Sequence, residues 1–97
     1  MAPKFNVPLD DPIYLFRTSE MMIHCNPAGG PLPTHEWFHK GVALDLKVDE
    51  EKDGYILYRN GTLKILKVKD TDAGEYRCLA SNSYGTAEST GTAIVLG

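Results

Sequence analysis

The apolar residues of this chain recur at every second position along most of its length, and this period decides which elements it can form. Met21, Ile23 and Cys25 follow it, as do Tyr76 and Cys78. Successive side chains of a strand point to opposite faces, so the pattern predicts strands rather than helices. Turn residues separate the runs at positions 26–31, 40–41, 53–54, 60–61, 72–74 and 84–85. Short strands at this spacing predict an all-β sandwich or barrel.

Residues 45–54 depart from this pattern. They carry Asp45, Asp49, Glu50, Glu51 and Asp53 and show little alternation. The carboxylates lack the ligand spacing and the terminal bidentate Glu of an EF-hand calcium loop. We therefore expect a solvated crossing loop here.

Length and charge exclude several functional classes. The chain has 97 residues and a net charge of -3, with Lys and Arg scattered along it. Without a basic stripe, nucleic acid is not an expected partner, and no polybasic patch for a membrane surface is present. No apolar run reaches the length of a membrane span, and residues 1–5 lack the apolar stretch of a signal peptide. We expect any signal or anchor of the parent protein to lie outside this chain.

Two cysteines, Cys25 and Cys78, are present. An even pair in a small β-rich chain suggests a disulfide and an oxidising compartment. Free buried cysteine is also common, so the pair by itself leaves both readings open.

The residues around the cysteines form an ordered set. Trp37 lies between them, twelve residues after Cys25, and Tyr76 stands two residues before Cys78. In a two-sheet sandwich, an indole can pack beside the sulfurs, and a tyrosine hydroxyl can bond back to the backbone at a corner. The remaining members are Leu63-x-Ile65, Asp72-x-Gly74 before the tyrosine, and Asn82-x-x-Gly85.

With these motifs in this order, the chain resembles the immunoglobulin superfamily, and its I-set in particular, from about Pro12 to Leu96. The resemblance implies an all-β, two-sheet sandwich with Greek-key topology. It implies a single domain over residues 1–97, with its core at about 12–96, that is an excerpt of a longer multi-domain protein. It also implies a Cys25–Cys78 disulfide and a core signature of Trp37, Leu63, Asp72, Gly74 and Tyr76.

The strand positions that the resemblance implies are 5–9, 13–16, 20–26, 34–39, 42–44, 55–58, 62–68, 74–82 and 85–96. One residue departs from the family pattern. His35, two positions before the tryptophan, stands where the family usually has an aliphatic residue. We expect its ring to face inward near a rim where its nitrogens find partners.

Catalytic and cofactor motifs are not found. No Gly-x-Ser-x-Gly elbow and no phosphate-binding glycine loop occurs in the sequence. His35 and His39 share a strand face but stand roughly 13 Å apart, too far to hold one metal ion. We predict no catalytic residue, no cofactor and no metal, and hence no enzyme.

Candidate surface residues follow from strand parity. Trp37 and Cys78 point inward, so Phe38, Arg77 and Leu79 point outward on the sheet of residues 34–39, 74–82 and 85–96. An apolar pair with charged neighbours is typical of an interface, although scattered surface apolar residues are also normal. Tyr84, at the tip between the last two strands, is a second candidate contact.

Asn60-Gly61-Thr62 is an N-glycosylation sequon at an expected hairpin. Asn-Gly also favours a type I′ turn, so a bare turn motif is the alternative reading. We predict a glycan on Asn60 in the native parent.

The sequon and its neighbours, with Ala80 to Ala87, are similar to neural cell-adhesion proteins of the contactin, neurofascin, Dscam and sidekick type. This implies a non-catalytic recognition module of an extracellular, membrane-anchored adhesion or receptor protein. Its partners would be the same or related immunoglobulin-family surface proteins, with neighbouring immunoglobulin or fibronectin-type domains in cis. The alternatives are an intracellular structural domain of the titin or palladin type, in the cytoplasm or sarcomere, and a passive spacer.

Overall fold

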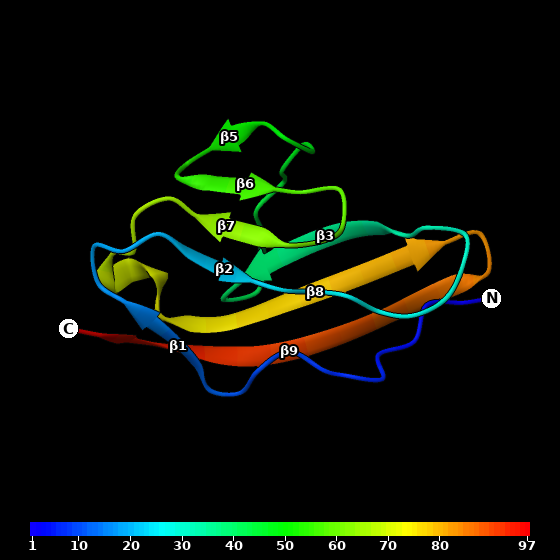
Figure 1. Ribbon diagram of the computed structural model, residues 1–97, viewed down its shortest axis with the longest axis horizontal. Coiled ribbons are helices and arrows are strands. Elements are labelled where there is room, and N and C mark those ends of the chain that lie inside the picture. Colours follow the sequence, from blue (N-terminus) through cyan, green and yellow to red (C-terminus); the bar gives the residue numbers. More distant parts are fainter.

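The computed structural model describes residues 1–97 and arranges nine strands in two sheets that pack face to face (Figure 1). One sheet has the order β1-β9-β8-β3-β4, and the other has the order β2-β7-β6-β5. The chain crosses between sheets after β1, β2, β4 and β7, which gives the Greek-key sandwich that the sequence predicted. The strands are β1 Ile13–Phe16, β2 Met21–Ile23, β3 Thr34–His39, β4 Val42–Ala43, β5 Glu51–Lys52, β6 Tyr55–Leu57, β7 Leu63–Ile65, β8 Gly74–Asn82 and β9 Gly85–Leu96.

A single 3-10 turn, η1 (Asp70–Asp72), joins β7 to β8. No helix of the structure is long and apolar enough to cross a bilayer.

The core forms between the two sheets around the disulfide. Cys25 and Cys78 are bonded, with their Cα atoms 6.4 Å apart, and both are buried. The indole of Trp37 is 2% exposed, and its Nε1 donates a hydrogen bond to the carbonyl of Gly61 at 2.8 Å. The bridge therefore joins the sheets where the largest core side chain already packs, as the family pattern implied.

A buried polar network fixes the corner before β8. The hydroxyl of Tyr76 donates to the carbonyl of Asp72 at 2.8 Å, and the hydroxyl of Tyr55 donates to Asp72 Oδ1 at 3.1 Å. The two hydroxyls lie 3.2 Å apart, and the backbone N–H of Lys69 donates to Asp72 Oδ2 at 2.7 Å. Burial raises the pKa of Tyr55 to about 12 and also raises the pKa of Tyr76. Both phenols are therefore held neutral. Tyr55 was not in the predicted signature.

Residues 5–9 do not form the expected strand. The segment makes only an isolated bridge nearby, in which Lys4 and Ala28 exchange hydrogen bonds of 2.9 and 2.8 Å. Pro8 has no N–H to give to a ladder, and the N–H of Leu9 bonds instead to Ser89 Oγ at 2.9 Å. The first regular strand is therefore β1.

The acidic stretch 45–54 is not entirely loop. Glu51–Lys52 forms β5, which pairs with β6 through the register Lys52↔Tyr55. Asp53 (φ 54°) and Gly54 (φ 84°) both have positive φ, as a two-residue type I′ hairpin requires. The turn signal was visible in the sequence, but a strand of two charged residues carries no alternation that could reveal it.

Several predicted strands are shorter than expected, and the Asn60-Gly61 turn differs in type. Of these two residues only Gly61 has a positive φ, so the turn is not type I′. The N–H of Gly61 bonds to the carbonyl of Tyr58, and the N–H of Tyr58 bonds to the carbonyl of Thr62, each at 2.9 Å. β7 ends at Ile65, and the N–H of Leu66 still bonds to the carbonyl of Gly54, the next pair in the register with β6.

His35 also differs in part from expectation. Its ring packs so closely against Gly61 that a Cβ there would lie 2.6 Å from His35 Nε2. That Nε2 is buried and has no hydrogen-bond partner. Burial lowers the pKa of His35, so the neutral ring is favoured.

Candidate binding surface

The outer face of the five-stranded sheet brings the predicted contact residues together. Register places Phe38 opposite Arg77 and Glu36 opposite Leu79 on β3 and β8. These side chains lie on the face away from the disulfide, because their chain neighbours Trp37 and Cys78 point inward. Strand parity predicted this grouping.

Arg77 covers much of the apolar surface expected at this face. Its guanidinium carbon lies 4.1 Å from the centre of the Phe38 ring, and Nη1 lies 3.6 Å from Glu88 Oε2. Phe38 and Leu79 are half-buried rather than exposed. Arg77 Nε is buried without a hydrogen-bond partner. The surface is therefore a cation–π stack with an acidic neighbour, beside one aliphatic side chain.

Tyr84 lies apart from this group, in the two-residue turn between β8 and β9. Its side chain is 68% exposed, and its backbone N–H bonds to Asn82 Oδ1 at 2.9 Å. The N-terminus lies at the same end of the sandwich (Figure 1). Asn82 Nδ2 donates to the carbonyls of Met1 and Pro31, which ties this end together.

The sequon occupies the hairpin between β6 and β7. Asn60 is exposed, and its Oδ1 accepts a hydrogen bond from the N–H of Thr62 at 3.0 Å. Thr62 is 4% exposed, and its hydroxyl lies 3.1 Å from His24 Nδ1. A glycan would attach at the side-chain amide nitrogen of Asn60. That side chain is exposed, and only its oxygen takes part in the hydrogen bond with Thr62.

Sequence reasoning missed a group of exposed apolar residues at the edge of the five-stranded sheet. The parallel register of β1 and β9 sets Tyr14 beside Ile94 and Phe16 beside Leu96. These four residues, here called the edge patch, are each about 40–55% exposed. The signal was present, because Ile13 and Leu15 point inward and their neighbours must point outward. What could not be read was that β1 and β9 lie side by side.

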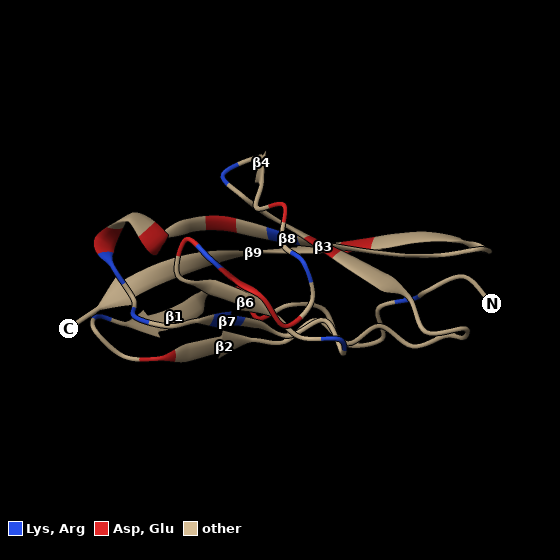
Figure 2. Cartoon of the chain, turned by 90° about the horizontal axis from the view of Figure 1, so that it is seen from above, with Lys and Arg blue, Asp and Glu red and all other residues tan.

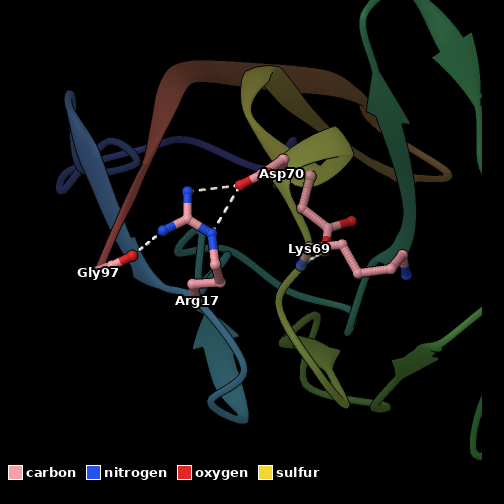
Figure 3. Close-up of polar contacts among 5 residues, drawn as sticks. Arg17, Lys69, Asp70 and Gly97 are labelled. Atoms are coloured by element: carbon pink, nitrogen blue, oxygen red, sulfur yellow. Dashed lines mark hydrogen bonds and ion pairs between the residues drawn. The ribbon is translucent and has the colours of Figure 1, made fainter.

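Charged residues flank the edge patch at the C-terminal end of the sandwich. Arg17, directly after β1, donates from Nε and Nη2 to Asp70 Oδ1 at 2.8 and 2.5 Å, and from Nη1 to the carbonyl of Gly97 (Figure 3). Arg17 and Asp70 are both partly exposed, so the pair adds little stability. It does hold the last residue of the chain against the corner before β8.

Elsewhere, acidic residues gather in the segment before β6, which carries Asp49, Glu50, Glu51 and Asp53, and the other charged residues are dispersed (Figure 2). No group of three or more His, Cys, Asp or Glu side chains has an arrangement suited to a metal ion.

Comparison with known proteins agrees with this architecture. A family profile described as immunoglobulin domain matches residues 2–82. The chain is an immunoglobulin domain. It is 40% identical to human contactin-4 over 76 residues, and this alignment covers 78% of the domain and 7% of contactin-4. It is 35% identical over 85 residues to the tyrosine-protein kinase-like otk of Drosophila willistoni, covering 88% of this domain and 8% of that protein.

Solved immunoglobulin structures superpose over nearly all of this domain. Sidekick-1 immunoglobulin domains 1–4 match with a TM-score of 0.83 at 28% identity, covering 99% of this domain and 24% of that chain. A titin Z1Z2 tandem matches with a TM-score of 0.83 at 25% identity, covering 99% of this domain and 50% of that chain. The domain spans less than a tenth of the length of the curated relatives it matches. Its similarity is to cell-adhesion and receptor proteins of the cell surface, with titin sharing the fold.

Proposed function

We propose that this immunoglobulin domain, of I-set type, is a non-catalytic protein-recognition module within a longer extracellular adhesion or receptor protein. The observation that carries the proposal is the Arg77–Phe38 stack beside Leu79 on an open sheet face. Similarity to contactin-4 and to the otk protein supports a cell-surface setting. The buried disulfide supports an oxidising compartment.

The stack has the composition of an interface hot spot. Arginine and aromatic side chains dominate such sites, and a guanidinium already held over a ring loses little further freedom on binding. Glu36 and Glu88 flank Leu79 across β3 and β9, which gives the apolar centre a charged rim. The area is small, so we expect weak binding by one domain and avidity from its neighbours in the array.

The test is the double variant Phe38→Asp with Leu79→Lys in the multi-domain parent. Both side chains lie outside the core, so the domain should still fold and keep its disulfide. Cell or bead aggregation, or capture of the partner, should fall. Met22→Asp, an exposed apolar position on the opposite sheet, is the matched control and should leave binding intact. Full binding by a folded double variant would make the domain a spacer at this face.

We also propose that Asn60 carries an N-linked glycan in the secreted parent. Its exposed side chain and free amide nitrogen support this, because a glycan there would extend into solvent. Thr62 is buried against His24, so the transferase would have to reach the sequon before this hairpin folds.

The alternative function is an intracellular structural domain, for which the titin neighbours give the specific reason. The oxidation state of the cysteines and the presence of a glycan distinguish the two proposals. A secreted recognition domain carries an oxidised Cys25–Cys78 pair and a glycan on Asn60. A sarcomeric domain carries reduced thiols and no glycan.

A further inference from the structure

Strand β1 is an edge strand that lacks the usual protection against pairing. It reads Ile-Tyr-Leu-Phe and pairs with β9 on one side only. Natural sheets guard their edges with very short strands, charges, proline or covering loops. The other edges are guarded in this way. β4 has two residues, β5 is a Glu-Lys pair, and β2 has only three residues.

The open edge of β1 has a defined set of free backbone groups. In a parallel ladder, every second residue of a strand directs its N–H and C=O to the same neighbouring strand. Arg17 directs its N–H to β9, because it bonds to the carbonyl of Leu96. Ile13 and Leu15 therefore also face β9, and the N–H and C=O of Tyr14 face outward, with the N–H of Phe16. The carbonyl of Phe16 is taken, because it accepts from the N–H of Ser19 at 3.0 Å.

We propose that two copies of this domain associate through β1, antiparallel, about a two-fold axis at Tyr14. In this register Tyr14 of one copy exchanges both hydrogen bonds with Tyr14 of the second copy. The N–H of Phe16 then meets the carbonyl of Pro12. The N–H and C=O of Tyr14 and the N–H of Phe16 therefore each gain a hydrogen-bond partner. Pro12, which has no N–H to donate, stands opposite the Phe16 carbonyl, which already accepts from Ser19.

Side chains agree with the same register. The edge patch would join its counterpart across the axis, which would cover the exposed rings of Tyr14 and Phe16. A self-complementary surface of this kind closes as a dimer and does not propagate.

The contact is short, so the association is weak. A strand of four residues with two aromatic side chains per copy lies at the low end of specific interfaces, and a Kd of about 10⁻⁴–10⁻³ M is expected. This inference does not depend on the recognition role proposed for the Phe38 face, because β1 lies at the far edge of the sheet from β3.

Sedimentation equilibrium of the 97-residue chain up to about 1 mM tests the proposal. The weight-average mass should rise from 10.7 kDa toward twice that value. Tyr14→Pro removes the outward N–H, which an edge strand tolerates, together with the phenol ring, and should remain monomeric. Tyr14→Phe keeps the backbone donor and should dimerise like the parent. Phe38→Asp with Leu79→Lys should also dimerise normally, which separates this surface from the recognition face.

A cross-linking variant tests the register without relying on the proline. Residues directly opposite in a hydrogen-bonded antiparallel pair have Cα atoms about 5.5 Å apart, within disulfide range. Tyr14→Cys should therefore form a covalent dimer on mild oxidation many times faster than Ile94→Cys, which is similarly exposed but lies on β9. A chain that stays monomeric throughout, a dimer that persists in folded Tyr14→Pro, or equal cross-linking by the two cysteine variants would each overturn the proposal.

Discussion

Alkaline unfolding offers a sharp test of the buried network at the corner before β8. Tyr55 and Tyr76 share Asp72 there, with the two hydroxyls 3.2 Å apart. Deprotonating either phenol would place a second negative charge beside a buried carboxylate. The folded domain therefore favours neutral phenols, and its stability should depend on pH above the range where free tyrosine titrates.

The sign and size follow from the pKa of Tyr55, which folding raises from 10.0 to about 12. Below pH 10 both states keep the proton and the stabilisation is complete. Between pH 10 and 12 only the unfolded chain loses it, so stability falls with rising pH by about 1.4 kcal/mol per unit. Tyr55 alone then accounts for a loss of about 2.7 kcal/mol across the window, and the raised pKa of Tyr76 adds a loss in the same direction.

The assay is urea unfolding followed by the fluorescence of Trp37, the only tryptophan, at several pH values from 8 to 12. Tyr55→Phe should cost about 1–3 kcal/mol at pH 8, because Asp72 Oδ1 loses its donor, but should show a shallower fall above pH 10. Tyr14→Phe, at an exposed tyrosine, is the control and should follow the parent. Equal slopes above pH 10 for the parent and Tyr55→Phe would refute the reasoning.

Three further outcomes are expected. Intact mass with and without reductant should show one disulfide, and replacing both Cys25 and Cys78 by Ala should lower stability by about 4 kcal/mol, the loop-closure value for a separation of 53 residues; two free thiols in unreduced secreted material would contradict this. Trp37→Ala should cost about 3–5 kcal/mol because the buried indole fills the core, whereas Glu51→Ala, at an exposed position on β5, should change the melting temperature little; similar melting curves would mean that the core is assigned wrongly. Material from a secretory host should carry a glycosidase-sensitive mass that Asn60→Gln abolishes, and its absence would favour the intracellular alternative.

The sequence by itself determined the fold class and the centre of the core. Alternation is a local property, because each side chain of a strand faces opposite to its neighbours whatever the strand pairs with. The sequence could therefore orient Phe38, Arg77 and Leu79 and place Trp37 and Cys78 inward. The ordered cysteine, tryptophan and tyrosine positions then pointed to the immunoglobulin sandwich, and the structure has the corresponding disulfide.

Alternation could not predict where each strand ends, nor that residues 5–9 do not form a strand. Strand limits depend on which backbone partner is available, and Leu9 bonds to Ser89, 80 positions away. A two-residue strand such as β5 has no period to detect. The partner of Tyr55 at Asp72 was likewise hidden, because β6 and η1 meet only once the sheets have packed.

Which side chains contact one another on the surface was decided by the tertiary structure. Only the parallel pairing of β1 with β9, across 80 positions of sequence, gathers Tyr14, Phe16, Ile94 and Leu96 into one patch. Arg77 lies over the Phe38 ring only because β3 and β8 pair, and this contact half-buries a ring that strand alternation alone would leave exposed. The alternation of a strand tells which way a side chain points, but what lies beside it depends on contacts between distant segments, which are formed when the chain closes.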